Sequence, residues 1–417
     1  MAAQRPHRLF AFLDGRRAGV FVQDPQLTFE YDADYLADPG ATPLSSAMPL
    51  AAGRYRQRIV LPWLDGLLPD DQAVRDRWAA GFGVSARNPF ALLTRMGLDT
   101  PGAVQLHLGE TLDEPVGQLV PLDERALGDR LRALRTEPAA WTVEGERWSL
   151  GGAQSKLALR WDGGWNEAIG DEPTTHILKP GVAGFRAQGL NEHLTMTAAR
   201  SLGLPTAVTQ YAEFDGEPAV IVTRFDRRER AGRIVRAHQE DACMALSVSR
   251  NRKYEQDGGP GAAQIIDLLR GTSDPVDGLH RFIDALAFNY LVGASDGHAK
   301  NYSILLGGRG STLAPLYDVA SSLPYDAEPG SGLRTLAMAI GGERRFGRVR
   351  RPHWDRLARR AGIDAEQLWL RVSELAGHLP DALASAIAAT PLAAASDLPA
   401  RYLDRLSRYL TEAGFER

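Results

Sequence analysis

Cysteine is almost absent from this chain of 417 residues, in which Cys243 is the single example. Without a second cysteine no intrachain disulfide can form, and a cysteine-rich zinc site is excluded. No apolar run approaches the roughly 18 residues that a membrane-spanning helix needs. The N-terminal segment also lacks the apolar core of a secretory signal. We therefore expect a cytoplasmic protein with no membrane partner.

The chain also has no large excess of positive or negative charge, since its formal net charge is -4. A generally basic nucleic-acid-binding protein is therefore not expected, although a local basic patch is compatible with this composition. Hydrophobic residues make up 44% and charged residues 24% of the chain, which excludes collagen-like, disordered and disulfide-scaffold classes. The length predicts two or three domains.

Several familiar catalytic motifs are also missing. Residues 151–156 (Gly-Gly-Ala-Gln-Ser-Lys) lack the glycine that precedes the lysine in a Walker A loop. There is no G-x-S-x-G elbow and no H-E-x-x-H pair. A zinc hydrolase built on Asp296 and His298 would need further ligands that the spacing does not supply.

Local signals divide the chain into four parts. A small N-terminal α+β domain is predicted for residues 1–110, and a connecting helix and linker for residues 111–140. The turns and elements that indicate them are an Asp-Gly hairpin within 8–22, a strand and turn at 27–36, a turn at Asp65-Gly66, helices at 71–82, 89–96 and 123–135, and a strand at 103–108.

A β-rich unit is predicted for residues 141–230 and a mostly helical unit for residues 231–417. The first contains a flexible turn at 151–154 and one helix, at 191–202, with Asn191 as N-cap and Gly203 as its stop. Its strands are predicted at 147–150, 156–161, 175–179, 207–214 and 218–225. The helices of the second are predicted at 279–292, 353–375 and 379–416.

The strongest chemical signal is the segment 295–301 (Ser-Asp-Gly-His-Ala-Lys-Asn). Asp296 can orient a substrate hydroxyl and accept its proton, and Asn301, five residues later, can bind a hard metal ion, as in the catalytic loop of protein kinases. Asp318 follows an apolar strand and a Gly-rich turn, so it can supply a second carboxylate for Mg²⁺. Asp-Gly-His turns are also ordinary loop chemistry, and Asp318 could merely cap a turn.

Upstream residues follow the order that a kinase requires. The Gly turn at 151–154 precedes Lys179 on a strand, then a helix whose first acid is Glu192, then a strand that ends at Thr223–Asp226, where a hinge belongs. Each feature has an ordinary alternative: a hairpin turn, a solvated strand-end lysine, or a helix acid favoured by the macrodipole. The joint order favours a kinase.

These residues resemble the HipA serine/threonine kinases, the toxins of bacterial HipBA-type toxin–antitoxin modules. The similarity extends over nearly the whole chain. It is carried by segments 66–70, 102–104, 148–156, 175–179, 224–227, 239–241, 253–261, 295–301 and 317–318. The resemblance implies an α+β, bilobed protein-kinase-like fold, with a β-rich N-lobe, a helical C-lobe and an appended small N-terminal α+β domain.

The resemblance also implies ATP and Mg²⁺ as cofactors and a role for each matching residue. Asp296 would be the catalytic base, Lys179 would meet the phosphates, and Asn301 and Asp318 would bind the metal. The residues implied to bind the nucleotide are Gly151, Gly152, Ala153, Gln154, Ser155, Lys156, Lys179, Thr223, Arg224, Phe225, His298, Lys300, Tyr317 and Asp318. Ser149 matches the family's inactivating autophosphorylation site, where a phosphate of about -2 charge would repel nucleotide.

Family membership would further imply three partners. These are a HipB-type helix-turn-helix antitoxin, operator DNA contacted mainly through the antitoxin, and a protein substrate. An aminoacyl-tRNA synthetase is the expected substrate, with glutamyl-tRNA synthetase first, and its phosphorylation would arrest growth. The basic run at 344–351 could touch nucleic acid or be a solvated face.

Two departures from the family pattern leave other functions open. Thr223 stands where the hinge can carry Glu, and Ser155 replaces an acid that is common in the loop. A catalytically weak, kinase-like corepressor that works with the antitoxin and a small-molecule kinase of the same fold are the alternatives.

Overall fold

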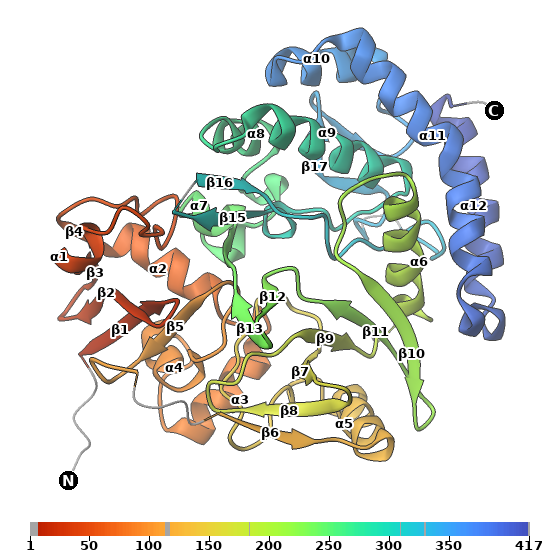
Figure 1. Ribbon diagram of the computed structural model, residues 1–417. Helices are drawn as coiled ribbons and strands as arrows, with labels where there is room; N and C mark the ends of the chain where they lie inside the picture. Colours follow the sequence, from red (N-terminus) through yellow and green to blue (C-terminus); the bar gives the residue numbers. More distant parts are fainter. Residues whose placement is uncertain (1–6, 113–116, 183, 309, 329–330, 416–417) are drawn as a thin grey trace.

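The computed structural model describes residues 7–112, 117–182, 184–308, 310–328 and 331–415. Figure 1 shows the N-terminal domain beside two further lobes, which we call the N-lobe and the C-lobe. Among these described residues, no helix is long and apolar enough to cross a membrane.

The N-terminal domain is an antiparallel sheet in the order β4-β3-β2-β1-β5, packed on helices. Its strands are β1 (Arg8–Leu13), β2 (Arg16–Gln23), β3 (Leu27–Tyr31), β4 (Arg54–Arg56) and β5 (Val104–His107), and its helices are α1 (Ala33–Leu36), α2 (Gln57–Gly66), α3 (Gln72–Phe82) and α4 (Pro89–Met96). The expected hairpin, helices and last strand are therefore present. The predicted turn at Asp65-Gly66 is wrong, because these residues end α2. Gly66 is required by packing instead, since a Cβ there would lie 2.5 Å from Met244 of the C-lobe.

The N-lobe is a six-stranded antiparallel sheet in the order β10-β11-β9-β7-β8-β6. Its elements are β6 (Gln118–Pro121), α5 (Glu124–Thr136), β7 (Leu157–Trp161), β8 (Trp165–Ile169), β9 (His176–Lys179), α6 (Gln188–Ser201), β10 (Thr209–Phe214) and β11 (Glu217–Thr223). The connecting segment predicted at 111–140, of which residues 113–116 lie outside the described residues, is part of this lobe. It supplies the edge strand β6, and α5 buries its leucine face against β10 and β11.

Two local predictions for this lobe are wrong. Residues 147–150 form no strand but only one isolated parallel β-bridge, between Trp148 and Asp99 of the N-terminal domain. In this bridge the Leu98 N–H donates to the Arg147 carbonyl, and the Ser149 N–H donates to the Asp99 carbonyl. Asn191 is not the N-cap of the helix, which begins at Gln188. It is fully buried, and its amide bonds the backbone of Ser321 in the C-lobe.

The C-lobe is mostly helical and also contains small sheets. Its longer helices are α8 (Ala262–Arg270), α9 (Pro275–Leu291), α10 (Arg351–Ala361), α11 (Ala365–Ala388) and α12 (Leu398–Ala413). The shorter elements are β12 (Arg227–Arg230), β13 (Arg233–Arg236), β14 (His238–Asp241), α7 (Ala242–Ala245), η1 (Arg250–Arg252), η2 (Glu255–Asp257), η3 (Ala299–Asn301), β15 (Ser303–Gly307), β16 (Gly310–Leu313), β17 (Thr335–Ile340), β18 (Glu343–Arg345) and η4 (Pro391–Ala395).

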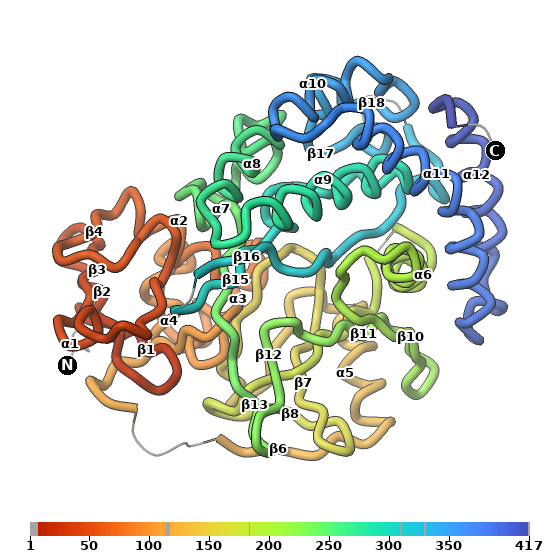
Figure 2. The backbone as a smooth tube through the Cα atoms, turned by 45° about the horizontal axis from the view of Figure 1, so that its top comes forward, coloured from red at the N-terminus to blue at the C-terminus, as the bar shows by residue number. Residues whose placement is uncertain are grey.

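The helix predicted at 279–292 corresponds to α9, which begins earlier and ends one residue sooner, but the two predicted C-terminal helices are divided differently. Gly362, with φ of 76°, ends α10, and the Asp364 side chain caps the start of α11. The helix predicted at 379–416 is interrupted between α11 and α12 by η4. Figure 2 shows α6 of the N-lobe beside α11, against which it packs. This helix therefore packs on α11 of the C-lobe as well as on β10 and β11 of its own lobe.

Candidate active site

A cavity of about 690 Å³ lies between the lobes and is also reached by Gly66 of the N-terminal domain. Except for Ser155, all the residues predicted to bind nucleotide or metal or to act in catalysis line this cavity. The Ser155 hydroxyl instead donates to the carbonyl of Pro138, 3.0 Å away. Its assignment to the nucleotide site rested on its position in the loop, and its side chain faces the other way.

Lys179 joins the two lobes at the centre of the cavity. Its ammonium lies 2.8 Å from Glu192 Oε1 on α6 and 2.5 Å from Asp318 Oδ1. Burial opposes the charge of Lys179, but the two carboxylates outweigh it and hold its pKa above the ordinary value. Burial also favours a neutral Asp318, yet Lys179 lowers the pKa of Asp318 to about 2. The structure thus places Glu192 as the partner of the strand lysine, which the sequence could not decide.

Residues of the segment 295–301 meet Asp318 in the same cavity. The Asn301 side chain donates to the carbonyls of Asp296, at 3.0 Å, and Asp318, at 3.3 Å, and this leaves its amide oxygen for another ligand. Asp318 has φ of 60°, a left-handed conformation that is uncommon for a non-glycine residue and typical of functional sites. Burial lowers the pKa of His298, so its ring is neutral near pH 7.

The loop at 151–156 curls over a buried lysine. The Lys156 ammonium donates to the Gly151 carbonyl at 2.6 Å and lies 4.7 Å from the centre of the Trp141 ring. Gly152 has φ of 93°, and a Cβ there would lie 2.7 Å from the lysine nitrogen. Burial, reinforced by the charge of Lys179, lowers the pKa of Lys156 to about 8. The loop therefore needs glycine at residue 152 and holds a weakly basic amine.

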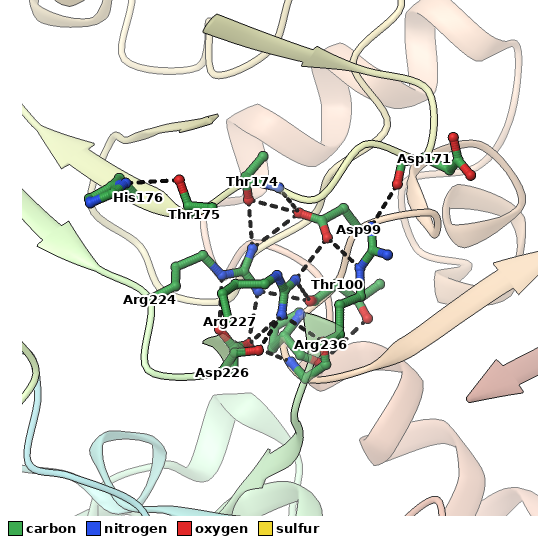
Figure 3. A network of polar contacts seen from close by, with 12 residues as sticks. Asp99, Thr100, Asp171, Thr174, Thr175, His176, Arg224, Asp226, Arg227 and Arg236 are labelled. Carbon is green, nitrogen blue, oxygen red and sulfur yellow. Dashed lines mark hydrogen bonds and ion pairs between the residues drawn. The ribbon is translucent and has the colours of Figure 1, made fainter. Parts of the chain in front are cut away.

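At the hinge, the rings of Phe225 and Tyr317 lie 5.4 Å apart and form an apolar wall of the cavity. The neighbouring Arg224 side chain does not lie along this wall. Figure 3 shows it directed into a buried network with Asp99, Asp226 and Arg227. Any contact of Arg224 with a nucleotide is thus limited to its backbone.

Two residues at the site had no role in the sequence-based interpretation, although both lie in segments that resemble the family. The Tyr254 hydroxyl donates to Asp296 Oδ1 at 2.5 Å. Asp70 of the N-terminal domain lies 3.3 Å from the Lys300 ammonium and 3.2 Å from that of Lys253. No local pattern could have indicated these contacts, because each partner is far away in the sequence.

Ser149 lies beside the cavity but does not line it. Its side chain is fully buried, and its hydroxyl donates to the carbonyl of Leu67 at 2.7 Å. The basic run at 344–351 is partly neutralised, since Arg345 pairs with Glu343, and Arg351 pairs with Asp355 and Glu366. These pairs are typical of a solvated face.

Comparison with known proteins gives the same assignment over both parts of the chain. The HipA N-terminal domain matches residues 9–107, and the HipA-like C-terminal domain matches residues 148–383. The chain is 37% identical over 383 residues to Y4mE of Sinorhizobium fredii, a protein named as a kinase. The aligned region covers 89% of this chain and 90% of that protein. It is 30% identical over 393 residues to the serine/threonine-protein kinase toxin HipA of Shewanella oneidensis. This second aligned region covers 88% of this chain and 87% of that protein.

A solved structure matches equally broadly. It is the Shewanella oneidensis toxin–antitoxin complex of HipA, HipB and operator DNA, with a TM-score of 0.82 and 27% sequence identity, over 97% of this chain and 98% of that one. The expected bilobed kinase-like fold with an N-terminal domain is confirmed by this match. The chain belongs to the HipA family of serine/threonine kinase toxins and is a protein kinase.

Proposed function

We propose that the cavity binds ATP and Mg²⁺ and transfers the γ-phosphoryl group to a serine or threonine hydroxyl of a protein, as the toxin of a HipBA-type module. The observation that carries this proposal is the ion pair of Lys179 with Glu192, which lines the same cavity as Asp296. Protein kinases need such a lysine–glutamate pair in place before they act on ATP.

The donor atoms fit a kinase metal site. Asp318 keeps 44% of its side chain exposed, and the Asn301 amide oxygen has no role in the loop's own bonding. No group of three or more acids, histidines or cysteines that could hold a metal occurs in the described ranges. That suits Mg²⁺, which is usually held by one or two carboxylates together with substrate phosphates. When bound, it would neutralise charge on the phosphates.

Each protein group then has a defined task. Lys179 orients the phosphates, and Asp296 accepts the proton of the attacking hydroxyl as that oxygen bonds to phosphorus and the bond to the ADP oxygen breaks. Phe225 and Tyr317 provide apolar surface for the adenine. Because Tyr254 already donates to one oxygen of Asp296, the substrate hydroxyl is expected to use the other oxygen.

The first experiment is phosphate transfer from labelled ATP, with Mg²⁺ or with a chelator, by the purified full chain. Asp296→Asn should lower transfer at least about 100-fold, the scale expected for loss of a general base. Asp404→Asn, an exposed acid on α12, serves as the matched control and should leave transfer unchanged. Equal transfer by wild type and Asp296→Asn would refute the assignment of the base.

Labelling a bacterial lysate identifies the substrate class. Label in an aminoacyl-tRNA synthetase, with glutamyl-tRNA synthetase as our first candidate, supports a growth-arrest toxin. Label in a small metabolite alone favours a small-molecule kinase, and nucleotide binding without transfer favours a kinase-like corepressor. The matched complex of HipA, HipB and operator DNA supports an antitoxin partner. We propose that this partner is a helix-turn-helix protein that carries the operator contact, and co-purification with such a protein tests it.

We also propose that the kinase phosphorylates its own Ser149. The hydroxyl is buried against Leu67, so the loop has to leave this position before Ser149 can react. The added charge of about -2 would then oppose its return beside the phosphates. Mass spectrometry of protein incubated with ATP should find phosphate on Ser149 in the wild type and none in Asp296→Asn. Absence of this phosphopeptide from active wild type would refute the proposal.

A further inference from the structure

The N-terminal domain bonds directly, through its backbone, to the loop at 151–156, which we call the phosphate loop, and to Ser149 just before it. The Asp70 N–H donates to the Gly152 carbonyl at 2.8 Å, and the Ser149 N–H donates to the Asp99 carbonyl at 2.9 Å. The Ser149 hydroxyl adds a third bond, to Leu67. A loop whose glycines give it freedom is thus fixed at its start by another domain.

The side chain of Asp70 reaches in the opposite direction, to the catalytic loop. Its carboxylate, only 8% exposed, lies between the ammonium groups of Lys300 and Lys253. Lys300 adjoins Asn301, and the carbonyl of Lys253 accepts from the Ala299 N–H at 3.2 Å. Burial opposes ionisation of Asp70, but the two lysines outweigh it and hold its pKa well below the usual range.

Asp70 itself is held firmly. The Arg250 guanidinium donates to its carbonyl at 2.5 Å and lies 3.1 Å from Asp65 Oδ2, near the end of α2. Gly66 packs against Met244 without room for a side chain. The segment from the end of α2 to Asp70 therefore has little freedom to follow a displaced loop.

A second aspartate makes a parallel connection to the hinge. The carboxylate of Asp99 lies 3.2 Å from Arg224, 2.8 Å from Arg227 and 2.9 Å from Arg236, as Figure 3 shows. Its own carbonyl accepts from Ser149 at the start of the phosphate loop. Asp70 thus connects the phosphate loop to the catalytic loop, and Asp99 connects the start of the phosphate loop to the hinge.

We propose that the N-terminal domain is a working part of the nucleotide site, in which Asp70 is a positioning residue that fixes the phosphate loop over the catalytic loop. The inference rests on the proposed nucleotide site. This positioning role explains why the N-terminal domain, to which we assign no catalytic residue, contributes Gly66 to the lining of the cavity. A Cβ at Gly151 would lie 3.5 Å from the Lys300 ammonium, so the loop passes close to this lysine. Asp70, at 3.3 Å, and Asp241, at 3.2 Å, both pair with Lys300.

The test compares Asp70→Asn with Asp71→Asn in the full chain. Both remove one negative charge without changing side-chain size, and asparagine can keep the helix cap that Asp71 gives to Ala73. For Asp70→Asn, the dissociation constant of a non-hydrolysable ATP analogue, measured by calorimetry, should rise about tenfold. Amide hydrogen exchange in residues 149–154 should be faster, and Asp71→Asn should match the wild type in both measurements.

Two further variants separate positioning from simple destabilisation. Val74→Ala shortens a fully buried side chain of the same domain and should lower the melting temperature without weakening the nucleotide complex. Asp70→Glu keeps the charge and should recover part of the affinity. Equal weakening by Val74→Ala at a matched melting temperature, or unchanged binding by Asp70→Asn, would overturn the proposal. Failure of the wild type itself to bind nucleotide would instead refute the proposed function.

Discussion

Replacing Glu240 by glutamine should change how the stability of the protein depends on pH. Glu240 lies on β14, is fully buried, and accepts hydrogen bonds from the Ser45 hydroxyl and the Ser46 N–H of the N-terminal domain, both at 2.6 Å. Burial outweighs these bonds and raises its pKa to about 7, and the neighbouring Asp241 adds to the rise. His238, two residues away, has its pKa lowered to about 4 by burial and supplies no compensating charge near neutrality.

The sign of the effect follows from the direction of the shift. The folded state holds the proton of Glu240 more tightly than the unfolded state, whose value is 4.5. The resulting stabilisation is complete below the unfolded pKa and is lost as the pH rises through about 7. Each pKa unit corresponds to about 1.4 kcal/mol, so the loss approaches roughly 3 kcal/mol at full ionisation. Glutamine can bond both serines and cannot ionise.

Urea unfolding of wild type and Glu240→Gln, followed by tryptophan fluorescence from about pH 5 to pH 8.5, measures this difference. The difference in free energy of unfolding, variant minus wild type, should increase by about 2–3 kcal/mol as the pH rises across this range. A difference that stays constant with pH would show that Glu240 is not held protonated by its surroundings, and the reasoning would fail.

Three other outcomes are expected. The value of kcat/KM for ATP should fall as the pH rises through about 8, where Lys156 loses its proton. In the Lys156→Met variant, kcat/KM determined from initial rates should not fall over this pH range. Asp99→Asn should lower the free energy of unfolding by about 3–5 kcal/mol, because it leaves buried arginines underpaired; denaturant titration against the exposed Asp129→Asn checks this. Tyr254→Phe should reduce kcat about tenfold by freeing the Asp296 carboxylate, with an unchanged KM for ATP in steady-state assays.

The order of catalytic groups was predictable because each group stands in a short local pattern. The Asp296–Asn301 spacing, the Gly turn and Lys179 on a strand are properties of neighbouring residues, and the structure brings them to one cavity. Side-chain direction was less predictable. Ser155 and Arg224 both sit within matching segments, but successive side chains of an extended backbone point to opposite sides, and both point away from the cavity.

Contacts between distant segments could not be predicted at all. Nothing near Asp70 in the sequence indicates that its partners are Lys253 and Lys300, since a local pattern carries no information on long-range pairing. For the same reason Asp65-Gly66 indicated a turn, although the glycine is needed where α2 meets Met244. This signal failed because glycine serves two purposes, turn formation and close packing.

The division of the hydrophobic core explains why these distant ion pairs matter. Leu178, next to Lys179, packs in one core that the N-lobe sheet shares with the N-terminal domain. Leu190 and Leu194, on either side of Glu192, pack in a second core with the helices of the C-lobe. The Lys179–Glu192 pair therefore crosses the boundary between the two cores, and Asp70–Lys300 crosses it again from the N-terminal domain. Separation of the cores would leave buried charges without partners, which is costly, so these two pairs together oppose opening of the nucleotide cavity.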